Sequence, residues 1–470
     1  MSQEKMSQQE SFKPEVFRPE LLSPAGSLKN LRYAFAYGAD AVYAGQPRYS
    51  LRVRNNEFDL EKLGIGINEA HELGKKLYVV SNIAPHNAKL KTYLQDLAPV
   101  IDLKPDALIM SDPGLIMMVR EAFPDQQIHL SVQANAVNWA TVKFWQQQGI
   151  SRVILSRELS LDEIEEIRLK VPDMELEVFV HGALCMAYSG RCLLSGYMNK
   201  RDPNQGACTN ACRWEYNAHE ATQDDVGQII ASSGASLQAQ ASAVQIQEPS
   251  DQLFLLQERG RPDEYMPAFE DEHGTYIMNS KDLRAIQHVE RLVKMGVHSL
   301  KIEGRTKSFY YCARTAQIYR QAINDAVAGK SFDKGLISSL ENLANRGYTD
   351  GFLQRHRHVD LQNYETGNSI SEQQQFVGEV IATNADSLTI EVKNRFSVGD
   401  SLELMTPKGN VTFQLSELND KQGHPIDVAK GSGHVVSIPC PQGIEASMGI
   451  LLRNLAEGQT TRQPHASVTA

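Results

Sequence analysis

The feature that most constrains the fold is a repeated alternation of short apolar runs, rich in Val, Ile and Leu, with longer segments whose apolar residues recur at helical spacing. Seven such runs precede residue 184, and they begin at Glu20, Ala41, Lys76, Ala107, Ile128, Arg152 and Glu175. An eighth run, HSLKIEGR, begins at His298 after a long interruption. The alternation predicts repeated β–α units around a buried parallel sheet. Eight units favour a TIM-like (β/α)8 barrel, with a doubly wound open sheet as the alternative.

Both of these folds bind ligands at the carboxyl ends of their strands. Polar residues close the apolar runs at those ends, namely Asn82, Asp112, Gln133, Arg157, Glu158, His181, Glu303 and Arg305. Any one of them can be a turn or capping residue, but together they are suited to line a pocket. From this set, the candidate catalytic residues are Arg157, Glu158, His181, Glu303 and Arg305.

A second domain is indicated where the β–α pattern gives way to short segments of alternating apolar and polar residues, separated by NADS, KGN and KGSGH turns. This pattern predicts a small antiparallel β-barrel, a type of domain that often binds RNA or protein, although the fold does not decide function. The predicted division is a disordered tail over 1–16, the TIM-like barrel domain over 17–330, a helical or irregular connection over 331–375, the β-barrel over 376–456 and a disordered tail over 457–470.

Within the first domain, residues 217–261 contain a run dominated by Ala, Ser and Gln. Low-complexity sequence of this kind buries too little apolar surface to fold alone, so we predict a flexible loop. The amino-terminal stretch lacks the apolar core of a signal peptide, and nowhere do about 18 apolar residues run together, which predicts a cytoplasmic protein with no membrane partner. The net charge of -10 argues against a continuous nucleic-acid-binding surface, though it allows a local basic patch.

Four of the six cysteines fall within 28 positions, at Cys185, Cys192, Cys208 and Cys212. In a reducing compartment such a cluster favours metal binding or catalysis over disulfides. Four thiolates are what a [4Fe-4S] cluster or a structural zinc ion requires. Zinc ribbons usually pair cysteines two to four residues apart, so the irregular spacing here favours iron and sulfur. Buried thiols that pack beside a loop are the alternative.

Several other signatures are absent or incomplete. Glu215 stands where a radical SAM enzyme would carry the third cysteine of its CxxxCxxC motif. HExxH, GxSxG and GxGxxG do not occur, so the sequence lacks the marks of zinc peptidases, nucleophile-elbow hydrolases and dinucleotide-binding proteins. Cys312 and Cys440 are isolated, and we interpret both as packing residues.

The segment EVFVHGALCMAYSGRCLLS, from Glu177 to Ser195, resembles the signature of the collagenase-like peptidases of unassigned catalytic type. ELLSPAG, GADAVYAG, SVQANAVN and SLKIEGR resemble the same family elsewhere, and the resemblance extends from about Glu20 to Asn454. Members of one subgroup of this family act in the prephenate-dependent, oxygen-independent formation of 5-hydroxyuridine at the wobble position of tRNA. Related members hydroxylate ribosomal RNA or the ubiquinone ring.

The resemblance implies a tRNA-modifying enzyme in which the four clustered cysteines hold a [4Fe-4S] cluster. Hydroxylation at C5 without dioxygen needs an oxygen donor, for which prephenate is the candidate, and an electron or atom carrier, for which the cluster is the candidate. Prephenate is a dicarboxylate, and arginine binds carboxylates through paired hydrogen bonds. The candidate arginines are Arg52, Arg54, Arg157 and Arg305. A peptidase and a non-catalytic iron–sulfur scaffold remain the alternative functions.

The wobble uridine lies in an unpaired anticodon loop, so turning it into a pocket costs little. Stacking and phosphate contacts with RNA require aromatic and basic residues close together. Such residues stand beside the cysteines, namely Lys200, Arg201, Arg213, Trp214 and Tyr216, and the alternative is a surface loop held by the metal site. The predicted partners are the tRNA anticodon loop and prephenate, with an electron donor or iron–sulfur assembly proteins as further candidates.

Overall fold

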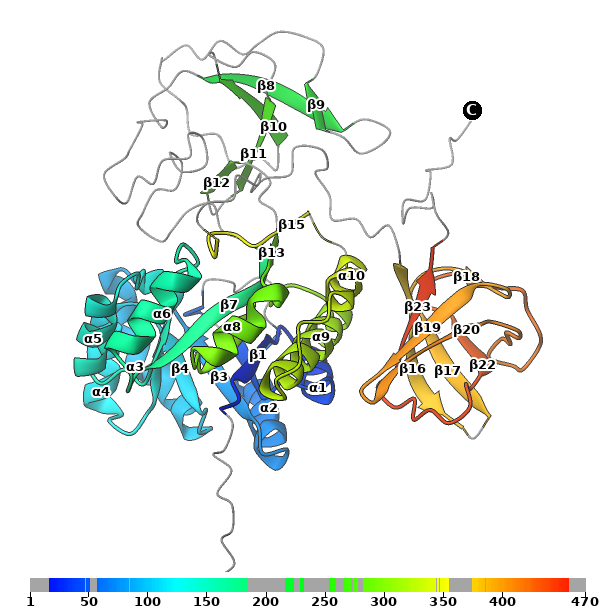
Figure 1. The fold of residues 1–470 in the computed structure, drawn as a ribbon, viewed down its shortest axis with the longest axis horizontal. Helices are drawn as coiled ribbons and strands as arrows, with labels where there is room; N and C mark the ends of the chain where they lie inside the picture. Colours follow the sequence, from blue (N-terminus) through cyan, green and yellow to red (C-terminus); the bar gives the residue numbers. More distant parts are fainter. Residues whose placement is uncertain are drawn as a thin grey trace, which may run out of the picture.

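The computed structural model describes residues 17–46, 48–50, 57–83, 85–183, 282–343, 345, 347–354, 374–384 and 386–455. Between residues 216 and 277 it also describes the backbone of five strands. These residues form a barrel ringed by helices, a separate antiparallel sheet above one end of the barrel, and an antiparallel β domain beside it (Figure 1). Among the described helices, none combines the length and hydrophobicity needed to cross a bilayer.

Eight parallel strands close into the barrel in the order β14, β1, β2, β3, β4, β5, β6 and β7, and β7 pairs with β14 to complete the ring. The strands are β1 (Glu20–Pro24), β2 (Ala41–Gly45), β3 (Lys76–Ser81), β4 (Ala107–Met110), β5 (Ile128–Leu130), β6 (Arg152–Ile154), β7 (Glu175–Ala183) and β14 (Ser299–Ile302). Each lies in an apolar run that the sequence predicted as a strand. The closed ring confirms the TIM-like barrel and excludes the open sheet.

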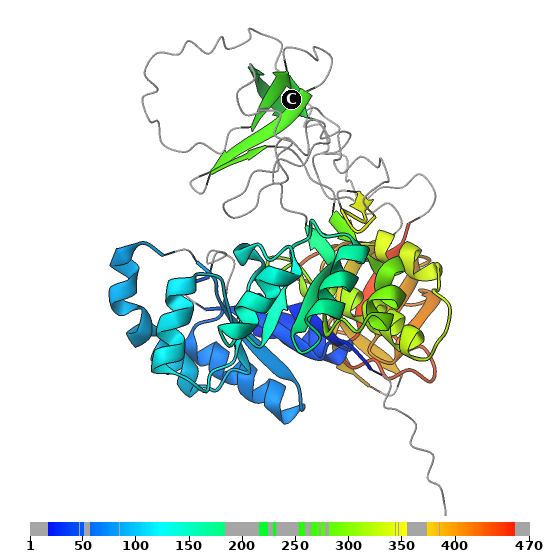
Figure 2. The ribbon, with the colours of Figure 1, turned by 60° about the vertical axis from the view of Figure 1, so that its left-hand side comes forward.

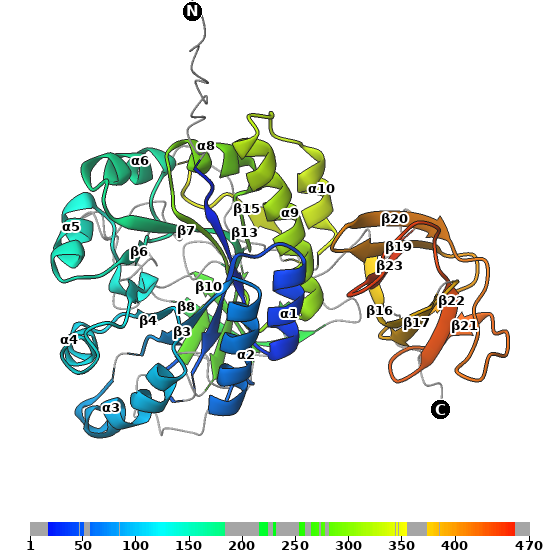
Figure 3. The same cartoon turned by 90° about the horizontal axis from the view of Figure 1, so that it is seen from below.

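Helices form an outer ring around the barrel (Figure 3). They are α1 (Leu28–Ala36), α2 (Leu60–Glu72), α3 (Asn87–Asp102), α4 (Pro113–Ala122), α5 (Trp139–Gln147), α6 (Leu161–Lys170), α8 (Val289–Lys294) and α9 (Phe309–Val327), with the short helix α10 (Gly335–Glu341) beyond them. Most begin at a capping side chain, as Ser160 and Glu163 do for α6 and Ser308 does for α9. Where such a cap is present, it sets the point at which the chain turns into the helix.

A long insertion separates β7 from the eighth barrel strand. Its described strands are β8 (Tyr216–Gln223), β9 (Ile229–Ala231), β10 (Leu253–Glu258), β11 (Tyr265–Asp271) and β12 (Gly274–Ile277), which form an antiparallel sheet in the order β12, β11, β10, β8 and β9. The sheet lies beyond the end of the barrel to which β7 runs (Figure 1, Figure 2). Within the flexible loop predicted over 217–261, the described residues 217–223, 229–231 and 253–258 lie in strands, and β8 and β10 pair with each other through backbone hydrogen bonds.

The chain returns to the barrel through β13 (Asp282–Arg284), which is antiparallel to β7. Asp282 stands opposite Ala183, the last residue of β7. The insertion therefore leaves and rejoins the barrel at the same point of its carboxyl end. The connection predicted over 331–375 contributes α10 and β15 (Tyr348–Thr349), and β15 pairs with β13.

The C-terminal domain is built from antiparallel strands, which confirms the predicted β domain. The strands are β16 (Gln374–Thr383), β17 (Ser387–Val392), β18 (Phe396–Ser397), β19 (Ser401–Thr406), β20 (Gly409–Gln414), β21 (Val428–Ala429), β22 (Val435–Pro439) and β23 (Ile450–Asn454). One sheet has the order β20, β19, β23, β16, β17 and β22, and β18 pairs with β21. Buried residues alternate with half-buried ones along β17, as expected for a strand with one face on a core that includes Ile390 and Phe396.

Buried polar contacts fix this domain to helices α1 and α9. Arg314 of α9 is almost fully buried and donates hydrogen bonds to Gln374 (3.0 Å) and Glu403 (2.9 Å). The Tyr37 hydroxyl, just after α1, donates to the carbonyl of Met405 at 3.0 Å. Met405 also belongs to the hydrophobic core of the barrel. The two domains therefore share one packed interface.

Replacing Arg314 with alanine should weaken this interface strongly, because Glu403 and Gln374 lose a buried cationic partner. We expect the free energy of unfolding in urea to fall by about 3 kcal/mol. Lys408→Ala is the control, since Lys408 and Glu445 form an exposed pair, and it should cost less than about 1 kcal/mol. If Arg314→Ala lowered the free energy of unfolding no more than Lys408→Ala does, the interface could not depend on buried polar contacts.

Candidate active site at the carboxyl end of the barrel

The interior of the barrel contains charged side chains, whereas barrels of this type are usually filled by apolar ones. Arg152 of β6 lies 2.6 Å from a Glu20 oxygen of β1 and 3.3 Å from a Glu177 oxygen of β7. Lys301 of β14 contacts the other Glu177 oxygen at 2.7 Å. Tyr78 of β3 donates its hydroxyl to Glu20 at 2.7 Å. Because these groups have little access to water, each charge depends on its partners in the interior.

Burial and charge pairing shift the pKa values of these groups in opposite directions. Burial lowers the pKa of the Lys301 ammonium group, although Glu177 opposes the shift. Burial alone would raise the pKa of Glu20, but Arg152 and Tyr78 outweigh it and the pKa lies below its usual value. For Arg152, burial is outweighed by the two carboxylates, so its pKa is raised. The interior therefore holds a connected network of alternating charges.

Two aromatic rings connect this network to the carboxyl end. Lys301 lies 4.4 Å from the ring centroid of Tyr43 and 5.4 Å from that of Phe179. The Arg157 guanidinium lies 3.8 Å from the same Phe179 centroid. The Tyr43 hydroxyl donates to Glu303 at 3.1 Å. Cation–π contacts that are shielded from water hold both ring and cation in place.

Arg157, Glu303 and Arg305 meet around Tyr43. Arg157 lies 3.8 Å from the Glu303 carboxylate, which is longer than a hydrogen bond. Arg305 is buried and donates to the Ser50 hydroxyl at 2.8 Å. Burial raises the pKa of the Tyr43 hydroxyl well above its usual value; the Glu303 charge adds to this rise, and the charges of Arg305 and Arg157 oppose it. The structure thus brings three predicted catalytic residues into one electrostatic unit.

The position of Arg305 depends on a glycine at the end of β2. A β-carbon on Gly45 would stand 2.3 Å from the Arg305 guanidinium and 2.9 Å from the Ser50 hydroxyl. Both distances are far shorter than van der Waals contact. Any larger residue at this position would therefore displace the guanidinium from the mouth of the barrel.

The other half of the carboxyl end carries uncharged polar side chains at the ends of β3 and β5. Asn82 follows β3, and its Nδ2 donates to Gln133 Oε1 at 2.8 Å. Ser131 follows β5 and also donates to Gln133 Oε1. After β6, the Ser156 hydroxyl donates to the predicted catalytic residue Glu158. The ends of β3 and β5 therefore present amides and hydroxyls, whereas guanidinium and carboxyl groups gather at the ends of β6 and β14.

His181, another predicted catalytic residue, lies in a cage of tyrosine rings. The rings whose centroids lie 5.5 to 5.8 Å from that of His181 belong to Tyr311, Tyr319 and Tyr348. The Tyr319 hydroxyl is 3.3 Å from His181 Nδ1. Burial, helped by two nearby cations, lowers the pKa of His181 to about 3. The imidazole is therefore neutral at physiological pH.

A shift in strand register explains the placement of His181. Lys301 of β14 pairs with Phe179 of β7, but the next residue, Ile302, pairs with His181. One residue of β7 is skipped, so His181 does not share the inward face of Phe179. It packs instead against residues of α9 and β15, and its catalytic role stays a prediction.

Other predicted site residues lie outside the described residues. These are Cys185, Cys192, Cys208, Cys212, Arg52, Arg54, Lys200, Arg201, Arg213 and Trp214. Tyr216 begins β8, where the backbone is described but the side chain is not. Within the described part of the chain, no group of three or more His, Cys, Asp and Glu side chains could hold a metal ion. The iron–sulfur ligands and the RNA contacts therefore stay predictions.

Two family models match the chain. The model described as peptidase family U32 matches residues 26–363, and the model of the peptidase family U32 C-terminal domain matches residues 372–453. The chain belongs to peptidase family U32. This membership confirms the resemblance to the collagenase-like peptidases, and the second match begins close to the start of β16.

Curated proteins similar to this chain align with most of its length. The "tRNA hydroxylation protein P" of Escherichia coli (strain K12) is 69% identical over 446 residues, which cover 94% of this chain and 98% of that protein. The protein of the same name from Haemophilus influenzae is 65% identical over 452 residues, covering 95% and 98%. The "23S rRNA 5-hydroxycytidine C2501 synthase" of Escherichia coli is 28% identical over 405 residues, covering 84% of this chain and 54% of that protein.

The cysteines that the structure describes are poor candidates for a peptidase nucleophile. Cys312 is fully buried, 3.4 Å from the Pro24 carbonyl and 3.6 Å from the Asn30 amide nitrogen. Burial raises its pKa to about 12, and burial also raises the pKa of Cys440. A catalytic thiol needs a lowered pKa and access to substrate. Both environments fit the predicted packing roles.

Sequence reasoning missed Tyr43, Phe179 and Lys301, which organise the site from within the strands. The candidates were sought only among polar residues that follow a strand. A usable signal was present, because Glu177 and Lys301 are charged residues inside otherwise apolar strands. A charge in a fully buried strand requires an opposite charge nearby, so the two could have been predicted as partners.

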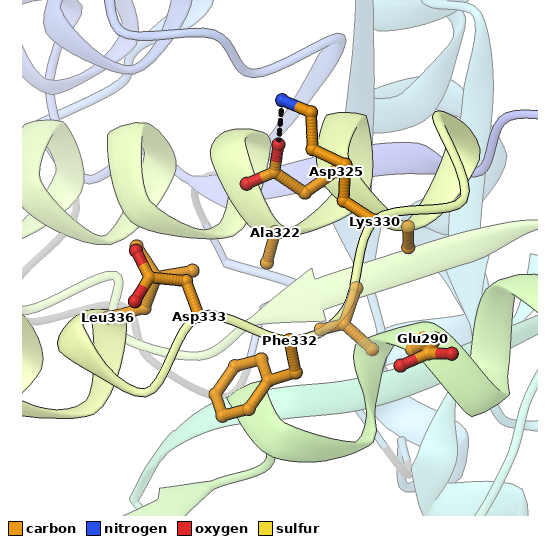
Figure 4. A pocket seen from close by; sticks show the side chains of 9 residues that line it. Glu290, Ala322, Asp325, Lys330, Phe332, Asp333 and Leu336 are labelled. Carbon is orange, nitrogen blue, oxygen red and sulfur yellow. Dashed lines mark hydrogen bonds and ion pairs between the residues drawn. The ribbon is translucent and has the colours of Figure 1, made fainter.

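The hollow in Figure 4 lies away from these residues. It is lined by side chains of α8, α9, α10 and the connection between the last two, including Asp325, Lys330 and Phe332. Lys330 and Asp325 form an ion pair at 2.9 Å. The hollow adjoins the C-terminal end of α9, which runs from the carboxyl end of the barrel back toward the amino end. We assign it no function.

The titration of His181 tests its placement. Its pKa of about 3 lies below the ordinary 6.5, so stability from the neutral ring is fully present above pH 6.5 and is lost as the pH falls toward 3. NMR titration, with the resonance assigned by its absence in His181→Phe, should show no protonation of this ring above about pH 4. A midpoint near 6.5 would contradict the buried tyrosine cage.

Proposed function

We propose that this chain hydroxylates the wobble uridine of tRNA to 5-hydroxyuridine in a prephenate-dependent, oxygen-independent reaction that uses a [4Fe-4S] cluster. The observation that carries the proposal is the group of Arg157, Glu303 and Arg305 around Tyr43 at the carboxyl end of the barrel. The relatives named for tRNA hydroxylation match nearly the whole chain and support the choice of substrate. We assign the reaction to the cytoplasm, where a reducing environment would keep the clustered cysteines available as thiolate ligands.

The charged half of the site suits the two carboxylates of prephenate. Among the described residues, the contacts of Arg157 leave its N–H donors available, since 3.8 Å to Glu303 is too long for a hydrogen bond and the contact with Phe179 is to the ring face. Arg305, oriented by Ser50, offers the second guanidinium. Glu303 is held by the Tyr43 hydroxyl and is the candidate group for proton transfer.

The insertion supplies the remaining parts of the proposal. Cys185, Cys192, Cys208 and Cys212 are the proposed ligands of the [4Fe-4S] cluster, which when bound supplies electron transfer. The insertion follows Ala183 and ends before Asp282, and these two residues pair with each other. Both lie at the end of the barrel that carries Arg157. The proposed contacts with the anticodon loop are Lys200, Arg201, Arg213, Trp214 and Tyr216. An electron donor or iron–sulfur assembly proteins are the further proposed partners.

Loss of this chain should abolish 5-hydroxyuridine in tRNA, as measured by mass spectrometry of nucleosides from a strain that lacks it. Expression of the wild type should restore the nucleoside, and Cys185→Ser should not. The purified wild type should contain about four iron and four sulfide ions per chain, and Cys185→Ser distinctly fewer. Cys440→Ser is the matched control and should behave as the wild type. Persistence of 5-hydroxyuridine in the deletion strain would refute the proposed function.

Replacing Arg157 with glutamine should raise the KM for prephenate by about 10- to 100-fold, because a charged hydrogen-bond pair with a carboxylate is lost. Arg157→Lys should recover only part of the loss, since lysine lacks the planar fork. Arg291→Gln, on the outer surface beside Asp162 and Glu165, is the control and should leave KM unchanged. Hydroxylation of tRNA at varied prephenate concentration measures the effect, and an unchanged KM in Arg157→Gln would remove Arg157 from the site.

A further inference from the structure

The uncharged half of the carboxyl end contains an amide that the proposed dicarboxylate site does not use. Gln133 lies in the 3-10 turn Val132–Ala134 (η1) that follows β5. Its neighbour Asn82 follows β3 and stands four residues after Tyr78, whose hydroxyl reaches Glu20 inside the barrel. Alternate residues of a strand share one face, so Asn82 is directed to the barrel interior as well. The amide group therefore stands at the mouth of the barrel.

Two hydrogen bonds orient the Gln133 amide. Its Oε1 accepts hydrogen bonds from Asn82 Nδ2, at 2.8 Å, and from Ser131 Oγ. A carbonyl oxygen has two lone pairs, and both are now used, so Nε2 must point away from these partners. The Gln133 residue as a whole is half-buried, so part of its side chain is exposed. Asn135, in a left-handed conformation with φ 54°, donates to the Gln133 backbone carbonyl at 3.2 Å and fixes the turn.

We propose that Gln133 is the residue that reads the target base, by donating a hydrogen bond from Nε2 to the C4 carbonyl of a uracil. This assignment rests on the proposed function and names the base-binding part of that site. Uracil carries a carbonyl acceptor at C4, whereas cytosine carries an amino donor there. Two donors cannot form a hydrogen bond with each other, so Nε2 would discriminate against cytosine. C5, the atom to be hydroxylated, is bonded to C4, so a contact at C4 also positions C5.

The neutral chemistry of this half suits a base better than the charged half does. A base that enters a pocket loses its hydration, and the protein groups that contact it lose theirs as well. Desolvation of an amide costs less free energy than desolvation of a guanidinium. The second amide, Asn82, and the Ser131 hydroxyl orient Gln133 without adding charge. The two substrates can therefore occupy opposite halves of one barrel mouth, the dicarboxylate beside Arg157 and the base beside Gln133.

Equilibrium binding of anticodon stem-loop RNAs to the full-length protein tests this assignment, with uridine or cytidine at the wobble position. We expect the wild type to prefer the uridine RNA by about tenfold. Gln133→Leu removes the donors and should bring the ratio to about one. Gln133→Glu keeps an oxygen that accepts from Asn82 and Ser131 but presents an acceptor outward, so the preference should invert toward cytidine. Gln126→Leu, at a half-buried glutamine of the amino end, should keep the wild-type ratio.

An unchanged ratio in both Gln133 variants would overturn the assignment, as would a wild type without preference. Circular dichroism must show that each variant is folded, and Gln133→Glu, which retains both orienting hydrogen bonds, decides the matter if Gln133→Leu does not fold. The deletion strain separates this result from the proposed function. Loss of 5-hydroxyuridine together with a ratio insensitive to Gln133 refutes only the base-reading role. Retained 5-hydroxyuridine together with a Gln133-dependent ratio refutes only the proposed reaction.

Discussion

The ion pair between Lys301 and Glu177 is the interaction on which the rest of the site depends. Two cations and two carboxylates in the barrel interior compensate one another, and loss of any one would leave a buried charge without a partner. Lys301 also faces the rings of Tyr43 and Phe179. Tyr43 in turn holds Glu303, and Phe179 carries the Arg157 guanidinium. The functional groups at the mouth are thus placed by charges one layer below them, which is a rigid form of support.

Helix α9 ties the same site to the C-terminal domain. Toward the barrel, the Tyr311 hydroxyl donates to the Glu303 carbonyl at 2.7 Å, and the Tyr319 hydroxyl donates to the Val180 carbonyl at 2.7 Å. Toward the small domain, Arg314 contacts Glu403 and Gln374. One helix therefore holds the loop that carries Glu303 and also anchors the second domain. The second domain is therefore held in a fixed position relative to the mouth of the barrel.

The fold could be predicted from sequence because each barrel strand is a short apolar run and most barrel helices begin at a recognisable cap. Arg157, Glu303 and Arg305 could be predicted as neighbours because the carboxyl ends of all strands in a closed barrel converge. The placement of His181 could not, because a one-residue shift of register reverses the face of a side chain and leaves no mark in the sequence. Tyr43 was missed for another reason: its role arises from Lys301 on β14 and from Glu303 just after that strand, both distant in the chain.

We propose that the target base enters the mouth of the barrel between its charged and neutral halves. Photo-crosslinking of a tRNA with 4-thiouridine at the wobble position, followed by mass spectrometry of the crosslinked peptides, tests this most directly. We expect crosslinks to the connection over 131–138 or to residues 303–308, which border the two halves. Crosslinks confined to the C-terminal domain, over 374–455, would contradict it.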